Sequence, residues 1–175
     1  MKTLTLLRHA KSAWDDPVQR DFDRPLNPRG RRAARTVAKE MRRLGLGFDL
    51  VLASPARRVV ETIGEVEQVL GPLGARFERD IYLAAPETLL DLARQADAGA
   101  ERLLIVGHSP GLEGVALALS GPAALRDALE VKYPTATLAE ISLPSASWTE
   151  VSEGTGQLTR FIRPRDLDPE LGPED

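Results

Sequence analysis

Three short apolar runs, each followed directly or after a loop by a helical pattern, constrain the fold of this chain most strongly. They occupy residues 4–7, 50–52 and 103–106. Mostly apolar runs of this length, without strict alternation, are typical of strands buried on both faces of a parallel sheet. The sequence therefore predicts an α/β fold: a three-layer sandwich with a mostly parallel central sheet and helices on both faces.

The pattern changes toward the C-terminus. Residues 136–143 and 157–163 alternate like strands with no long helix between them, so we expect an antiparallel strand at one side of the sheet. Residues 164–175 are rich in proline and acidic residues and are predicted to form a loose tail. The length of 175 residues fits one domain, which we place at residues 1–163.

Composition excludes several classes of function. Lys and Arg number 23 against 26 Asp and Glu, so no global basic field is present and nucleic acid is not expected as a partner. The chain has no cysteine, which excludes disulfides, thiolate nucleophiles and Cys-based metal sites. No apolar stretch is long enough to span a bilayer or form a signal peptide, so we expect a cytoplasmic protein without a membrane partner.

Two histidines, His9 and His108, follow the first and third apolar runs and are the only histidines in the chain. The carboxyl ends of parallel strands meet at one edge of a sheet, which is where α/β proteins bind ligands. Arg8 precedes His9, Ser109 follows His108, and Arg58 lies just after the second run. Guanidinium groups bind phosphate oxygens and a neutral imidazole can attack phosphorus. The same edge lacks the carboxylate cluster expected around magnesium, so the sequence predicts phosphoryl transfer through a phosphohistidine, without metal or cofactor.

Three segments resemble motifs of the histidine phosphatase superfamily. The first, Leu7-Arg8-His9-Ala10-Lys11-Ser12, is similar to that family's Arg-His-Gly signature, and the others are Ser54-Pro55 with Arg58 and Thr62, and residues 106–111 around His108. The Arg-His-Ala-Lys-Ser form, with Asp-Arg-Pro-Leu-Asn at residues 23–27, resembles the SixA-like phosphohistidine phosphatase branch. The resemblance implies a phosphoglycerate mutase-like fold.

The resemblance also implies roles for the site residues. His9 would be the nucleophile, and Arg8, Arg58 and His108 would hold the phosphoryl oxygens, with His108 able to act protonated. Ser12 and Ser109 are expected to contact the substrate, whereas Arg57 is adjacent to Arg58 on a helix and should face elsewhere. Ala10 replaces the more usual glycine of the signature, at a position where the backbone can come close to the phosphate.

A general acid is harder to assign. Relatives that act on phosphate esters usually carry an acidic residue in an insertion before the second histidine, but here one edge strand and one helix account for residues 75–100. The resulting open site admits a side chain that projects from another folded protein, which favours a histidine-phosphorylated protein as substrate. The imidazole leaving group of phosphohistidine also needs less help than an alkoxide. If an acid exists, Asp23 and Glu87 are the candidates. The alternative is a broad phosphomonoesterase that acts on small phosphate esters.

Two further alternatives belong to other classes. Gly107-His108-Ser109-Pro110-Gly111 also fits the G-x-S-x-G nucleophile elbow of serine esterases, but in that fold the catalytic histidine follows the serine, and no histidine follows Ser109. A non-catalytic phospho-binding module would keep the arginines without turnover. The presence of both His9 and His108 favours catalysis over binding alone.

Overall fold

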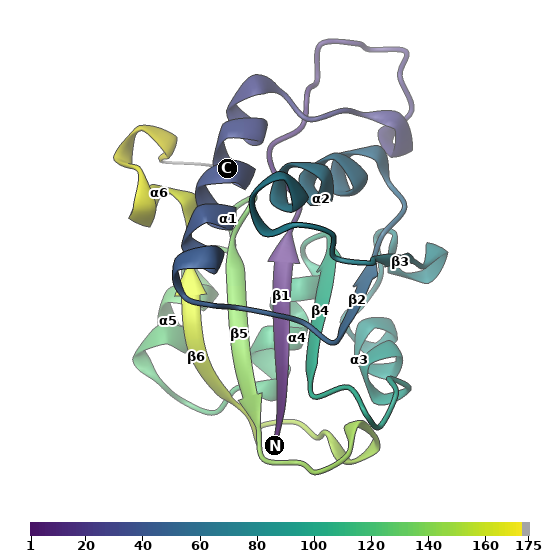
Figure 1. Cartoon of the computed structure of the whole chain (residues 1–175), viewed down its shortest axis with the longest axis vertical. Coiled ribbons are helices and arrows are strands. Elements are labelled where there is room, and N and C mark those ends of the chain that lie inside the picture. The colour runs from purple at the N-terminus through teal and green to yellow at the C-terminus, as the bar shows by residue number, and fades with distance from the viewer. Residues whose placement is uncertain (173–175) are drawn as a thin grey trace.

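The computed structural model describes residues 1–172, which form one six-stranded sheet with helices on both faces (Figure 1). The strands are β1 (Lys2–Arg8), β2 (Leu50–Ala53), β3 (Arg76–Phe77), β4 (Arg102–Gly107), β5 (Leu138–Leu143) and β6 (Gln157–Ile162). Their order is β3-β2-β4-β1-β5-β6, and β5 runs antiparallel to both of its neighbours, whereas the β1–β4, β2–β4 and β2–β3 pairs are parallel. The predicted sandwich, with its mostly parallel sheet, is therefore confirmed.

The helices form the two outer layers of the sandwich. α1 (Pro28–Arg43) and α2 (Arg57–Leu70) cover one face of the sheet, and α3 (Pro86–Arg94), α4 (Gly111–Leu119) and α5 (Ala124–Val131) cover the other (Figure 1). None of the helices in residues 1–172 combines the length and the apolar character needed to cross a membrane.

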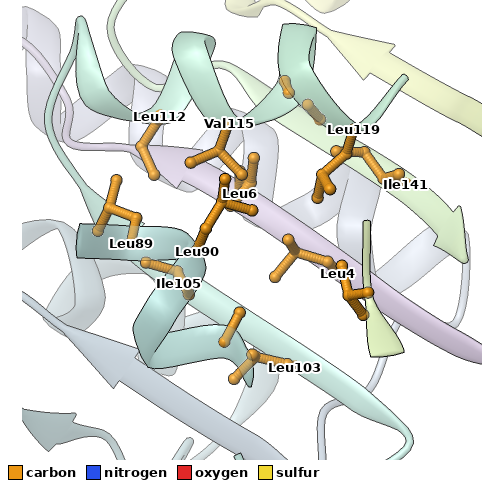
Figure 2. Close-up of a cluster of buried hydrophobic side chains, with 14 of the residues drawn as sticks. Leu4, Leu6, Leu89, Leu90, Leu103, Ile105, Leu112, Val115, Leu119 and Ile141 are labelled. Atoms are coloured by element: carbon orange, nitrogen blue, oxygen red, sulfur yellow. The ribbon is translucent and has the colours of Figure 1, made fainter. Parts of the chain in front are cut away.

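Alternate residues of the central strands enter two separate cores. Leu103 and Ile105 of β4 pack in the cluster that contains the side chains of α3 and α4 (Figure 2), whereas Leu104 and Val106 pack in the cluster that contains those of α1 and α2. All four side chains are fully buried. Burial on both faces explains why the strands read as nearly continuous apolar runs rather than as alternating patterns.

The start of α1 is fixed by local chemistry that the sequence predicts. The side chain of Asn27 accepts a hydrogen bond from the amide of Gly30 at 2.7 Å, and Pro28 occupies the first turn. A Cβ atom at Gly30 would lie 2.1 Å from the carbonyl oxygen of Lys11. Only glycine therefore allows α1 to pack this closely against the segment that follows β1.

Two elements differ from the sequence-based prediction. The edge strand expected at residues 75–83 is reduced to β3, followed by the 3-10 helix η2 (Arg79–Ile81), because both residues of β3 are exposed and gain little from a longer strand. α5 is not predicted, since Leu129 is its one buried residue and its eight residues give too short an apolar pattern.

The prediction of a loose tail is wrong for residues 164–172. α6 (Pro164–Leu167) and the 3-10 helix η4 (Pro169–Leu171) lie beside α1, and the side chain of Leu171 is fully buried. Arg32 of α1 forms ion pairs with Asp168 at 2.5 Å and Glu170 at 3.1 Å. The acidic residues Asp168 and Glu170 thus pair with Arg32 of α1, and the packed structure continues past residue 163. Residues 173–175 of the predicted tail lie outside the described residues.

Candidate active site

The two histidines meet at the carboxyl edge of the sheet. β1 and β4 are neighbours in parallel register, with Arg8 opposite Gly107, and the amide of His9 donates to the carbonyl of Gly107 at 3.0 Å. Each histidine is the first residue beyond its strand, so both rings leave the sheet at the same level. Their ring centroids lie 5.3 Å apart. The predicted meeting of His9 and His108 is therefore confirmed.

A cavity of about 330 Å³ opens at this edge. It is lined by all six residues predicted as catalytic or substrate-binding, namely Arg8, His9, Ser12, Arg58, His108 and Ser109. Lys11, Trp14, Asp21, Arg24, Leu83 and Thr135 complete the lining. Ala10, the departure from the usual glycine, is fully buried in the core beside α1 and α2 and does not line the cavity.

His9 is held as a neutral ring with one nitrogen available. Its Nδ1 lies 2.7 Å from the carbonyl oxygen of Ala10, which fixes the proton on Nδ1 and leaves the lone pair on Nε2. Burial, together with the charges of neighbouring groups such as Arg58 and Arg8, lowers the pKa of His9 well below its ordinary value. The side chain of Thr62 accepts from the amide of Ala10 at 2.9 Å and fixes the backbone that carries this arrangement.

Both ring nitrogens of His108 contact other side chains. Nδ1 lies 3.3 Å from Nη2 of Arg58, which can only donate, so the proton resides on Nε2, which donates to the hydroxyl of Ser54 at 2.8 Å. Burial and the neighbouring charge of Arg58 lower the pKa of His108 to about 3. His108 is therefore neutral here, unlike the protonated form considered from the sequence. A phosphoryl dianion beside it would shift the pKa in the opposite direction.

Arg58 enters the pocket from the first turn of α2, and its side chain is only 3% exposed. Its guanidinium donates to the backbone carbonyl of Asp21 at 2.8 Å and to the carboxylate of Asp21 at 3.1 Å, while its buried Nε has no hydrogen-bond partner. Arg57 lies on another face of the helix, is exposed and pairs with Glu61 at 2.9 Å. The prediction that Arg58 faces the pocket and Arg57 faces elsewhere is therefore confirmed.

Asp21, in the short 3-10 helix η1 (Asp21–Asp23), connects several groups of the pocket. Its carboxylate accepts hydrogen bonds from Arg24 at 2.9 Å, from the hydroxyl of Tyr82 at 2.5 Å and from Arg58. Burial alone would raise the pKa of Asp21, but the hydrogen bonds from Tyr82 and Arg24 and the charge of Arg58 outweigh it and lower the pKa to about 2. Among the described residues this is the one carboxyl group that lines the cavity, and it is ionised at neutral pH.

The two acids proposed from the sequence do not lie at the pocket. Asp23 pairs with Arg20 at 3.0 Å and its side chain is 46% exposed, whereas Glu87 is exposed in the first turn of α3. Neither lines the cavity. The sequence names Asp23 in this acidic loop, whereas Asp21 is the carboxylate that lines the cavity, because the path of a loop without periodicity determines which side chain turns inward. Within residues 1–172, no three His, Asp or Glu side chains cluster as a metal site would require.

Sequence and structure comparisons identify the family and the fold. Residues 4–83 match the sequence profile described as the histidine phosphatase superfamily (branch 1). An uncharacterized protein of Mycobacterium tuberculosis is 33% identical over 163 residues, which cover 91% of this chain and 100% of that protein. The crystal structure of a candidate phosphohistidine phosphatase SixA from Agrobacterium tumefaciens is 30% identical with a TM-score of 0.79, covering 92% of this chain and 97% of that one. A protein histidine phosphatase SixA complexed with tungstate has the same fold, with 21% identity, a TM-score of 0.74 and coverage of 95% and 99%.

Proposed function

Because the chain belongs to the histidine phosphatase superfamily, we propose that it removes phosphate from phosphohistidine on a protein partner, through a covalent phosphohistidine on His9. The observation that carries the proposal is the state of His9. A buried, neutral imidazole presents Nε2 in a cavity that arginines also line, and the one carboxyl group among its described lining residues is ionised. The likeness to SixA structures supports the same substrate class.

In the first step, the lone pair of His9 Nε2 forms a bond to phosphorus while the P–N bond to the substrate imidazole breaks. The electron pair of the broken bond leaves with the substrate ring. If the other nitrogen of that ring carries a proton, the ring leaves as neutral imidazole. The hydrogen bond from Nδ1 to the carbonyl of Ala10 stabilises the positive charge that His9 gains on phosphorylation.

In the second step, water attacks phosphorus and the P–N bond to His9 breaks. Its electron pair returns to Nε2, and the protons of the water remain on the released phosphate. In both steps Arg8, Arg58 and His108 surround the transferring group, whose developing charge the guanidinium cations stabilise. These fixed cations supply the charge neutralisation for which other phosphoryl-transfer enzymes use magnesium.

The ionisation of Asp21 favours phosphohistidine over small phosphate esters, the two substrate classes left open by the sequence. An alkyl phosphate ester releases an alkoxide, which must be protonated as it leaves. With a pKa of about 2, Asp21 holds no proton to donate at neutral pH. Phosphohistidine avoids this requirement, because its own ring can be protonated from solvent before transfer.

The serine esterase alternative loses its support in the structure. A nucleophilic Ser109 would need a histidine to accept its proton. The ring nitrogens of His108 instead contact Ser54 and Arg58, and the buried hydroxyl of Ser109 has no hydrogen-bond partner. Ser109 is therefore better suited to contact a substrate oxygen than to act as a nucleophile.

The proposal is tested by comparing turnover of a histidine-phosphorylated protein with turnover of a panel of small phosphate esters. We expect kcat/KM to be higher for the phosphohistidine protein and turnover to be absent in the His9→Ala variant. Rapid quenching should trap an acid-labile, base-stable phosphate on His9. A label on another residue, a strict magnesium requirement, or faster turnover of the small esters would overturn the proposal, and binding without any turnover would favour a non-catalytic phospho-binding module.

A further inference from the structure

Two exposed apolar side chains stand at the mouth of the pocket. His9, His108 and Arg58 are buried, whereas Trp14 is 76% exposed and Leu83 is 58% exposed, although all five line the same cavity. A phosphoryl group held beside the buried residues must have the rest of its molecule extending toward the exposed ones. Trp14 and Leu83 are therefore placed to contact whatever the phosphate is attached to.

Trp14 is fixed by stacking on a buried cation. The guanidinium carbon of Arg24 lies 3.5 Å from the centre of the Trp14 ring, and the Arg24 side chain is only 8% exposed. Hydrogen bonds to Asp21 and to the hydroxyl of Ser12 hold this guanidinium in place. The indole is thus supported on one side and open to solvent over most of its surface. A flat apolar surface that is already ordered loses little conformational entropy when a ligand packs on it.

Leu83 is held in a conformation that a bulky residue rarely adopts. Its φ is +51°, and it belongs to neither of the two hydrophobic cores. The residues on both sides fix this turn: Tyr82 donates to Asp21, and the carbonyl of Ala84 packs so closely on Gly111 that a Cβ there would lie 2.3 Å away. The Leu83 side chain makes no contact with either core that would offset the cost of placing a leucine at this strained, exposed position.

We infer that Trp14 and Leu83 are specificity-determining residues that pack against the imidazole ring and the adjacent chain of a phosphohistidine-bearing polypeptide. The inference rests on the proposed function and names the part of the site that recognises the substrate beyond its phosphate. An imidazole ring has a flat, largely apolar face that suits an indole, and flanking residues of a polypeptide can cover an exposed leucine. The cavity of about 330 Å³ holds a phosphoryl group and its ring, and the polypeptide remains outside.

Three substrates separate these contributions in one experiment. Phosphoramidate has the P–N bond but neither ring nor chain, free phosphohistidine adds the ring, and a phosphohistidine peptide adds the chain. For the unmodified protein we expect kcat/KM to rise along this series. The ratio of the peptide value to the phosphoramidate value then measures recognition beyond the phosphate.

The Leu83→Asn variant gives the cleanest test, because asparagine tolerates a positive φ better than leucine does. We expect its peptide-to-phosphoramidate ratio to fall about 10-fold, as for loss of one buried leucine contact, with an unchanged or raised Tm. Trp14→Ala should lower the same ratio, and Trp14→Phe should restore most of it. Trp14→Ala also uncovers Arg24, so the ratio is the quantity to compare rather than the rate on phosphoramidate alone.

Leu125→Ala is the matched control, since Leu125 is 38% exposed on α5 and does not line the cavity. Its ratio should equal that of the unmodified protein. If the unmodified protein prefers the peptide but the Leu83 and Trp14 variants keep its ratio, the inference is wrong and the proposed function stands. If the unmodified protein turns over phosphoramidate and small esters but shows no preference for phosphohistidine, the inference about Trp14 and Leu83 and the proposed function are both wrong.

Discussion

His9 and His108 occupy equivalent places in the fold but are held in different ways. Each follows directly after a central strand, and burial lowers the pKa of both rings. His9 is fixed through Nδ1 by a backbone carbonyl, which leaves Nε2 available, whereas both nitrogens of His108 contact side chains, Ser54 and Arg58. The position at the strand end thus brings a histidine to the pocket, and the hydrogen bonds around the ring determine whether it can attack phosphorus.

The largest expected effect comes from removing each ring in turn. His9→Ala should reduce turnover to background, because none of the other described residues that line the cavity presents an imidazole nitrogen without a hydrogen-bond partner. His108→Ala should lower kcat by about 10²- to 10³-fold, the range found when one group that stabilises a transition state is removed. Single-turnover phosphate release measures both. Equal losses of turnover in the His9 and His108 variants would contradict the assignment of His9 as the nucleophile and His108 as a stabilising group.

Arg58 lies beside both histidines, since it contacts His108 and lines the same cavity as His9. Arg58→Ala should weaken transition-state stabilisation by about 2 to 4 kcal/mol, measured as kcat/KM. Arg57→Ala is the matched control on the same helix turn, because Arg57 pairs with Glu61 away from the cavity. Its kcat/KM should remain within about twofold of the unmodified value, and a similar loss in both variants would point to damage to α2.

The neutral state of His108 predicts a pH dependence of stability. Its pKa is near 6.5 in the unfolded chain and about 3 in the folded one, so the unfolded state binds more protons between these values. Stability is therefore lost as the pH falls below about 6.5, with a contribution from His108 of about 2 kcal/mol at pH 5. His108→Gln cannot titrate and should lose less stability between pH 7 and pH 5. Urea unfolding at the two pH values measures the difference, and identical losses in both proteins would show that the folded state does not hold His108 neutral.

The smallest effect is expected from the partner of His108. Ser54 is fully buried and accepts the hydrogen bond from Nε2 of His108. Ser54→Ala should cost about 1 kcal/mol, seen as a fall in kcat of about fivefold, because the ring loses the contact that fixes its tautomer. Ser54→Thr keeps the hydroxyl and should recover most of the activity. An unchanged kcat in Ser54→Ala would show that the tautomer of His108 does not matter for the reaction.

The sequence predicts the parts of the molecule that follow regular patterns. Apolar runs buried on both faces identify β1, β2 and β4, and parallel pairing of these strands brings His9 and His108 together. Residues 7 and 106 end the two apolar runs, and predicting that the histidines beyond them share a pocket needs no knowledge of side-chain packing. It depends only on where the strands end.

The parts that the sequence does not predict depend on the path of irregular segments. Asp21 and Asp23 both belong to an acidic loop, yet only Asp21 turns toward Arg58 and Tyr82. The C-terminal segment reads as solvated because the carboxylates of Asp168 and Glu170 pair with Arg32 of α1, more than 130 positions away along the chain. Composition describes a segment by itself and gives no sign of such a distant partner.

The strand order has a consequence for how the site responds to fluctuations. β1 and β4 each have a hydrogen-bonded neighbour on both sides, so their amides should exchange with solvent deuterium only when the whole domain opens. The segment that carries Trp14 and Asp21 lies outside the sheet and is held by side-chain contacts, such as those of Arg24 with Trp14 and Asp21, so we expect its backbone amides to exchange at a lower opening free energy. Amides at the mouth of the pocket should therefore exchange with deuterium before those of the two strands that place the rings of His9 and His108.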